Sequence, residues 1–264
     1  MRPDGNPTRV FLAGDSSVCS REAGRAPMTG WGQTLPLFFT RDVEIVNCAR
    51  AGASSRTFAE RGRLAWILEH LRPGDYLVTS FGLIDHKPEK EWRTEAFHDY
   101  QRYLRYFVDG ARDRGAHPVL VSPHERCTWD EHGNLRQVFG EYPMAMKELA
   151  AETSTPYLDL YAQSLEWWTQ LGPEGTRALF MYLAPGVHPN YPEGIEDSTH
   201  LLPEGAVACA RFVAHQLAVR RIVPAHWVTA LDTPTFAPHA FGWLDDAEHA
   251  ALTRARTRGA GETL

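Results

Sequence analysis

The chain has 264 residues, enough for one large α/β domain with or without a short appendage. Its net charge of −6, its pI near 6.1 and the lack of a Lys- or Arg-rich block argue against nucleic acid or an anionic membrane as partner. No apolar stretch approaches the roughly 20 residues of a membrane span. Because no signal-peptide pattern is visible at the start, we predict a cytoplasmic protein.

Five short β-rich runs alternate with longer amphipathic segments. The predicted strands are Val10–Ala13, Val43–Asn47, Tyr76–Phe81, Pro118–Ser122 and Tyr157–Leu160. The predicted helices are Thr57–Leu71, Thr94–Arg114, Pro143–Glu152 and Pro203–Ala218. Such alternation predicts parallel strands with right-handed crossovers, and therefore a three-layer α/β/α sandwich with a five-stranded parallel sheet.

The pattern weakens from Val223 onward into a segment rich in His, Trp, Pro and Thr. We therefore predict a main domain over residues 1–222 and a C-terminal extension, 223–264, that packs on it. A final charged helix is predicted at Leu244–Arg256, and the last residues, 259–264, are predicted to be disordered. The four cysteines have no CxxC or metal-type His spacing, so we expect reduced thiols in a cytoplasmic protein.

Turn-forming motifs follow the first two predicted strands, at the edge where doubly wound sheets bind ligands. In GDSS, residues 14–17, Ser16 can present its hydroxyl outward and its N–H into a pocket, although these residues are also ordinary turn formers. After the second strand, Gly52 can bring a backbone N–H close to a ligand. The following Ser54 and Ser55 fit simple helix caps equally well.

A further motif, DSTH, precedes the helix that opens at Pro203. On one loop, the Asp197 carboxylate can reach Nδ1 of His200, which leaves Nε2 free to take a proton from a serine. A capping aspartate followed by a solvent-exposed histidine explains the same residues. The motif taken alone favours neither interpretation.

In this order, GDSS, GWGQ, NCARAGASSRTF, SFGLID and HPNYPEGIEDSTHLLPEGA resemble the SGNH (GDSL-type) hydrolases, in particular their rhamnogalacturonan acetylesterase branch. The resemblance spans about residues 10–216 and implies the flavodoxin-like SGNH hydrolase fold. It implies Ser16 as nucleophile, His200 as base and later acid, and Asp197 as the carboxylate that orients His200. It also implies an oxyanion hole made by the N–H groups of Ser16 and Gly52 and by an asparagine side chain.

That asparagine belongs to a block that usually reads G-x-N-D and here reads Gly82-Leu83-Ile84-Asp85. Ile84 therefore occupies the asparagine position and has no side-chain donor. Loss of one oxyanion donor typically lowers turnover on the order of 10²- to 10³-fold, so we expect weakened or redirected catalysis rather than none. The candidates for a substitute donor are His86, His124 and Asn190.

The resemblance also implies residues that contact the substrate. We expect this role for Trp31, Asp85, His188, Asn190 and Tyr191. Core packing is the rival interpretation for Trp31.

The leading hypothesis is a serine esterase that removes an acyl group, expected to be acetyl, from a carbohydrate or sugar-containing metabolite, which is a small-molecule or oligosaccharide ester. This reaction needs no metal and no organic cofactor. One alternative is an acyltransferase that uses the same serine, because Ile84 would make the site drier. The other is a catalytically silent carbohydrate-binding protein, against which the joint presence of Ser16, Asp197 and His200 argues. The sequence leaves the sugar, the acyl group and the oligomeric state open.

Overall fold

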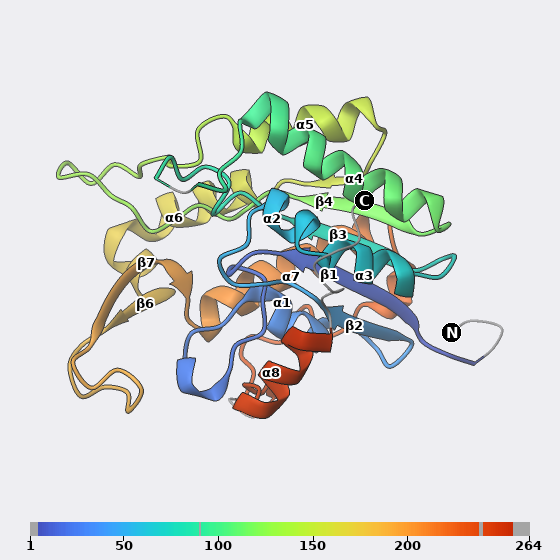
Figure 1. The fold of residues 1–264 in the computed structure, drawn as a ribbon. Coiled ribbons are helices and arrows are strands. Elements are labelled where there is room, and N and C mark those ends of the chain that lie inside the picture. The colour runs from blue at the N-terminus through green and yellow to red at the C-terminus, as the bar shows by residue number, and fades with distance from the viewer. Residues whose placement is uncertain (1–4, 90, 238–239, 256–264) are drawn as a thin grey trace.

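A five-stranded parallel sheet runs through the middle of the molecule (Figure 1). The computed structural model describes residues 5–89, 91–237 and 240–255. The strand order is β2-β1-β3-β4-β5, and the strands are β1 (Thr8–Gly14), β2 (Val43–Asn47), β3 (Tyr76–Ser80), β4 (His117–Val121) and β5 (Tyr157–Leu158). This order is the flavodoxin-like one and confirms the predicted sheet.

Helices cover both faces of the sheet and give three layers (Figure 1). One face carries α2 (Ser55–Glu60), α3 (Arg63–His70), α4 (Gln101–Asp113) and α5 (Tyr142–Glu152). The other carries α1 (Trp31–Thr34), α6 (Leu160–Arg177) and α7 (Pro203–Val219). The predicted three-layer sandwich is therefore confirmed.

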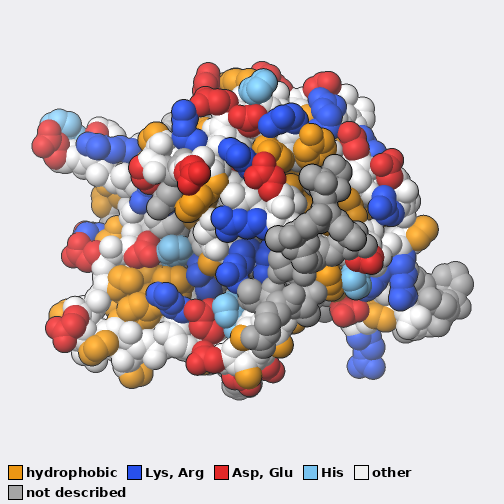
Figure 2. All heavy atoms as spheres, in the orientation of Figure 1, with side chains coloured by type: hydrophobic (Ala, Val, Ile, Leu, Met, Phe, Trp, Pro, Cys, Tyr) orange, Lys and Arg blue, Asp and Glu red, His pale blue; other side chains and the backbone are white. Residues whose placement is uncertain are grey.

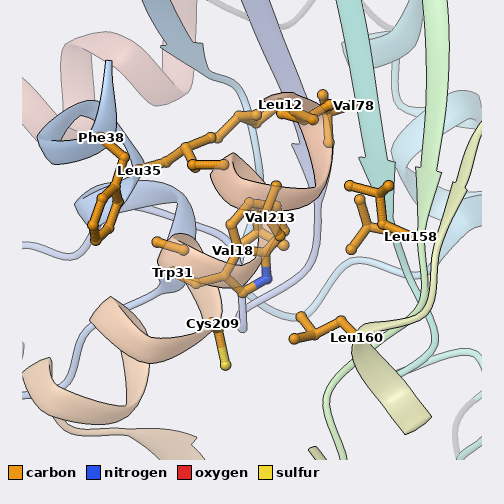
Figure 3. Packing of buried hydrophobic residues seen from close by; sticks show 14 of the residues in the cluster. Leu12, Val18, Trp31, Leu35, Phe38, Val78, Leu158, Leu160, Cys209 and Val213 are labelled. Atoms are coloured by element: carbon orange, nitrogen blue, oxygen red, sulfur yellow. The ribbon is translucent and has the colours of Figure 1, made fainter. Parts of the chain in front are cut away.

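The central strand β1 contributes to the cores on both faces because its side chains alternate. Val10 and Leu12 belong to the cluster under α1 and α7, whereas Phe11 and Ala13 belong to the cluster under α2 to α5. Figure 3 shows the first of these clusters, with Leu12 in the sheet and Trp31 among the helices. Because β1 is buried on both faces, its carboxyl end is held firmly in place. Ser16 follows directly after that end.

Several element boundaries differ from the sequence prediction. The predicted helix at Thr57–Leu71 is two helices, α2 and α3, because Gly62 between them adopts a left-handed φ of 77°. The strand predicted at Tyr157–Leu160 ends at Leu158, and α6 begins at Leu160. A two-stranded antiparallel sheet, β6 (Phe180–Leu183) with β7 (Ile195–Leu201), was not predicted at all.

The C-terminal extension contacts the main body of the protein in the part that the structure describes. Phe39 forms an isolated bridge with Val228, and Glu22 forms one with Leu244. The helix expected near the end is α8, Asp246–Ala255. The domain boundary at residue 222 stays a prediction, and the predicted disorder of 259–264 lies outside the described residues.

The described surface carries charges of both signs, and no described helix is long and apolar enough to span a bilayer. Figure 2 shows Lys and Arg side chains gathered near the centre of the face seen in Figure 1. The predicted cytoplasmic location stays a prediction.

The long connection from β4 to α5 is fastened by the buried side chain of Glu125. Its carboxylate accepts hydrogen bonds from the N–H groups of Arg126, at 2.7 Å, and Val138, at 2.9 Å. Burial raises the pKa of Glu125 to about 7, although these two hydrogen bonds act in the opposite direction. The native protein therefore holds a proton that the unfolded chain releases at lower pH.

Wild-type stability should consequently fall as the pH rises from the ordinary carboxyl range through about 7. We expect the loss of melting temperature between about pH 5 and about pH 8 to be smaller in Glu125→Gln, which has no carboxyl to ionise. The exposed Glu131 of the same connection supplies the control, Glu131→Gln, which should follow wild type. Identical pH profiles for all three proteins would contradict the assignment.

Candidate active site

Ser16 lies in a tight turn directly after β1. The turn is closed by the Asp15 carbonyl, which accepts hydrogen bonds from the N–H groups of Val18 and Cys19. Gly14 is required before it, because a Cβ there would lie 2.8 Å from the carbonyl oxygen of Ser80. The turn places Ser16, 5% exposed, beyond the carboxyl end of the central strand.

His200 lies opposite Ser16, and its ring joins the serine to Asp197. The Nε2 atom is 3.1 Å from Ser16 Oγ, and Nδ1 is 2.6 Å from Asp197 Oδ2. The predicted loop is in fact strand β7, which carries both residues. This chain of hydrogen bonds has the geometry in which the imidazole can take the serine proton while the carboxylate stabilises the imidazolium.

Asp197 is held as an anion by the groups around it. Burial would raise the pKa of Asp197, but its hydrogen bond to His200, the charge of His200 and the N–H groups of Thr199 and His200 outweigh burial and lower it to about 2. The two N–H groups lie 2.7 and 3.1 Å from Oδ1. The carboxylate therefore stays charged and fixed in direction at neutral pH.

Ser16 and Gly52, whose backbone N–H groups are the predicted oxyanion donors, both line one cavity. Among the described residues, neither the N–H of Ser16 nor that of Gly52 has a hydrogen-bond partner. Gly52 adopts a left-handed φ of 76°, which glycine tolerates best. Ile84 also lines this cavity, beside Leu83, so the wall is apolar at the asparagine position.

Asp15 is a buried carboxylate whose role the sequence analysis missed. It accepts hydrogen bonds from Ser17 N and Oγ, at 2.9 and 2.8 Å, and from Leu83 N, at 3.1 Å. Burial raises its pKa, and these hydrogen bonds oppose that rise. Asp15 thus ties the turn of Ser16 to the loop of Ile84, and the aspartate of GDSS was the available signal.

Two residues predicted to contact the substrate are enclosed in the protein instead. Trp31 has no exposed surface and its side chain packs in the core, while its backbone N–H donates to the Ser17 carbonyl at 2.8 Å. Asp85 is also fully buried, and it accepts hydrogen bonds from Ser55 Oγ at 2.6 Å and Thr94 Oγ1 at 2.9 Å. Both predictions of substrate contact are therefore corrected, because these side chains support the site from behind.

The loop between β6 and β7 holds the other three predicted substrate contacts. Asn190 donates to the carbonyl groups of Ala23 and Ala26, and Tyr191 donates to that of Arg25. His188 accepts from the Asn190 N–H at 3.2 Å. None of the three lines the cavity in the described part of the chain, so they fasten its rim rather than form its wall.

The proposed substitute donors do not reach the cavity either. The Asn190 amide is already bound, and His86 Nδ1 lies 2.8 Å from the Gly82 carbonyl. His124 is buried, and burial lowers its pKa to about 4. Within the described residues, neither histidine lines the cavity, and the asparagine position keeps no side-chain donor among these candidates.

The cavity over Ser16 has a volume of about 550 Å³ and a cationic lining. Its charged walls combine two carboxylates, of Glu22 and Asp197, with five cationic side chains: Arg21, Arg25, Arg50, Arg63 and Lys87. Among the described residues, no group of three His, Cys, Asp or Glu side chains is placed to hold a metal ion. The local charge is therefore opposite in sign to the net charge of the chain.

Arg21 connects this lining to the nucleophile turn. Its guanidinium is buried and donates to the Ser16 carbonyl at 2.7 Å. The backbone N–H of Arg21 donates to the side-chain oxygen of Gln33 at 3.0 Å. The arginine thus positions the backbone of Ser16 as well as contributing charge.

A parallel α/β sheet with a serine, a histidine and a carboxylate joined beyond its strands is the arrangement of a class of serine hydrolases. The chain belongs to the GDSL-like lipase/acylhydrolase family, whose model matches residues 12–192. The expected SGNH membership is thereby confirmed, and the protein is a carboxylic-ester hydrolase.

Two curated relatives from Bacillus subtilis (strain 168) match most of the chain. Rhamnogalacturonan acetylesterase RhgT is 45% identical over 208 residues, which cover 79% of this chain and 88% of that protein. The probable rhamnogalacturonan acetylesterase YesY is 37% identical over 208 residues, covering 78% and 90% respectively.

Solved structures share the fold. The structure of the protein YxiM from Bacillus subtilis has a TM-score of 0.69 and 28% identity, and the match covers 83% of this chain and 58% of that one. Axe2, an acetylxylan esterase from Geobacillus stearothermophilus, has a TM-score of 0.56 and 20% identity, with coverage of 86% and 98%.

A fluorophosphonate probe should label Ser16 covalently, because His200 Nε2 is placed to take its proton. We expect labelling to drop sharply in His200→Ala and to persist in Ser17→Ala, whose hydroxyl bonds to Asp15 instead. Peptide mass spectrometry locates the adduct. An adduct on another serine, or none on folded protein, would refute the arrangement.

Asp197→Asn should keep the fold and lose turnover on the order of 10³- to 10⁴-fold, because the imidazole loses its orienting anion. The exposed Glu196 of the same strand provides a control, Glu196→Gln, which should match wild type. Ester turnover and melting temperature are measured together. Near-normal turnover in folded Asp197→Asn would reduce Asp197 to a structural residue.

Proposed function

We propose that the protein is an acetylesterase that acts on a carbohydrate ester through Ser16, His200 and Asp197. The observation that carries this proposal is the 3.1 Å contact between Ser16 Oγ and His200 Nε2 at a cationic cavity. A protein that only binds sugar has no need of this contact. The acetyl group and the carbohydrate are proposed from RhgT and YesY, whose names give both.

The reaction proceeds in two transfers of the acetyl group. Ser16 Oγ attacks the ester carbonyl while His200 takes its proton. The bond between the carbonyl carbon and the sugar oxygen then breaks as His200 protonates that oxygen, which leaves as the sugar hydroxyl. Water attacks the acetyl-serine, gives a proton to His200, and releases acetic acid as that proton returns to Ser16. The N–H groups of Ser16 and Gly52 face the negative charge that develops on the carbonyl oxygen.

The sugar is proposed to be acidic. Five cationic side chains line the cavity against two carboxylates, and one of these, Asp197, is already paired with His200. Excess positive charge in a recessed site concentrates anionic ligands, which the negative protein surface would otherwise repel. A sugar that carries a carboxylate, such as a uronate, matches this field.

Acetyl transfer to another alcohol is the second candidate, and one observation favours it. Leu83 and Ile84 make the cavity wall apolar beside Ser16, which disfavours water near the acetyl-serine. Product analysis in the presence of sugar alcohols separates the two reactions. Acetylated acceptor as the main product would replace hydrolysis by transfer.

A panel of acetylated neutral and acidic oligosaccharides tests the proposed function, with acetate release as the readout. We expect faster release from the acidic members, a kcat/KM for them that falls with added salt, and none with Ser16→Ala. Equal rates on the neutral and acidic members, without salt dependence, would refute the proposal that the sugar is acidic. If no member releases acetate although the fluorophosphonate still labels the protein, the proposed acetylesterase activity is refuted.

The apolar place of Ile84 predicts a gain of function. Ile84→Asn adds a donor beside the N–H groups of Ser16 and Gly52, so kcat on an aryl acetate should rise roughly tenfold or more. Ile84 is only 7% exposed, and a buried amide without all its partners costs about 1–3 kcal/mol of stability. Steady-state kinetics and thermal melting measure the two effects.

Leu83→Asn is the matched control, because it puts the same amide one residue away on the same wall. We expect no comparable rise from this variant. If Ile84→Asn is folded and slower on every ester, Ile84 shapes the cavity for its own chemistry. Acyl transfer then becomes the better proposal.

A further inference from the structure

The C-terminal segment Phe241–Leu252 is joined to the N-terminal stretch that begins at Arg21. Leu244 exchanges backbone hydrogen bonds with it, from Leu244 N to the Arg21 carbonyl at 2.9 Å and from Ala23 N to the Leu244 carbonyl at 2.7 Å. The Trp243 indole donates to the Met28 carbonyl at 2.9 Å. The end of the chain is therefore built onto the stretch whose arginine holds the Ser16 carbonyl.

Helix α8 continues this segment with a defined start and direction. Asp245 accepts from the N–H of Glu248 at 2.7 Å, and Glu248 accepts from the N–H of Asp245 at 3.0 Å, which is a reciprocal helix cap. One turn later, His249 Nε2 lies 3.6 Å from the Glu22 carboxylate. The cap and this contact direct one face of the helix toward the active site.

Three side chains of the segment line the same cavity as Ser16 and His200. They are Leu244, His249 and Leu252, and the last two are three residues apart on one face of α8. All three lie beyond residue 192, where the match to the family model ends. Asp197 and His200 of the active site also lie beyond that end, so the wall belongs to the same C-terminal part of the chain as these two residues.

We propose that the segment Phe241–Leu252 determines substrate size by closing one side of the active-site cavity, so that short acidic sugar acetates react faster than the same ester within a long polymer. This inference rests on the proposed function and extends it to the length of the carbohydrate. Leu244 and Leu252 contact the sugar, and Trp243 anchors the segment.

One side of the cavity is closed because residues 21–26 are hydrogen-bonded to two other segments of the chain. The segment is hydrogen-bonded to residues 21–23, and the β6–β7 loop is hydrogen-bonded to residues 23–26 through Asn190 and Tyr191. A cavity of about 550 Å³ lies within the roughly 300–1,000 Å³ of small-molecule sites. An ester within a polymer needs room for the chain on both sides of the reacting sugar, whereas a short or terminal sugar needs one opening.

Full-length variants at Leu252 test the wall. Leu252→Trp fills the cavity and Leu252→Ala enlarges it, while Ala251→Trp adds the same indole at an exposed neighbour that does not line the cavity. Substrates are 4-nitrophenyl acetate and chemically acetylated oligogalacturonides from the dimer to the polymer. Circular dichroism and melting temperature confirm folding.

Wild type should show a kcat/KM roughly tenfold or more higher for the dimer than for the polymer, per acetyl group. Leu252→Ala should narrow this ratio, and Leu252→Trp should lower kcat/KM on the dimer more than on 4-nitrophenyl acetate. Ala251→Trp should follow wild type throughout. The proposal that this segment limits substrate size would be refuted if both Leu252 variants kept the wild-type ratio of kcat/KM between dimer and polymer. It would also be refuted if wild type preferred the polymer.

Calorimetric binding of unacetylated oligogalacturonides in Ser16→Ala provides a readout that needs no catalysis. We expect the dimer to bind less tightly when Leu252→Trp is added, and Ala251→Trp to leave its affinity unchanged. If Leu252→Trp weakens dimer binding but the wild type has no esterase activity, the proposed function is refuted and the role of the segment in limiting substrate size stands. Esterase activity with unaltered binding and ratios would refute the wall alone.

Discussion

The hydrogen bond between Ser16 Oγ and His200 Nε2 is the interaction on which the site depends, and it joins residues 184 positions apart. Ser16 is fixed by β1, which is buried on both faces, and by the glycine before its turn. His200 lies on β7, which pairs with β6, and the N–H groups of Thr199 and His200 hold the Asp197 carboxylate beside the His200 ring. The distance between Ser16 Oγ and His200 Nε2 therefore depends on the packing that positions both elements.

Buried carboxylates carry much of that packing without touching the reacting atoms. Asp15 joins the nucleophile turn to the loop of Ile84, and Asp85 joins that loop to the start of α2. Burial raises the pKa of Asp85 to about 6, despite hydrogen bonds that favour its charged form. Groups that the mechanism does not use thus set the distances that it needs, and they make the geometry sensitive to changes behind the cavity.

The alternation of apolar runs predicted the sheet and its layers, and the order of GDSS and DSTH predicted the residues that lie together. The pattern did not show which way a side chain faces, so Trp31 was expected at the cavity and lies in the core. Strands β6 and β7 were missed because their alternation is weak and they are short. β6 has four residues, and β7 has seven, four of which are the DSTH motif. The contact of Leu244 with the Arg21 stretch depends on tertiary folding, which local sequence does not encode.

Rapid-quench mass spectrometry during turnover of an aryl acetate tests the central claim most directly, because it observes the intermediate itself. The account predicts that the peptide containing Ser16 gains the mass of one acetyl group, that this species forms within a burst, and that Ser16→Ala abolishes it. His200→Ala should form it far more slowly. Steady turnover without any acetylated peptide, or with acetyl on another residue, would contradict the account.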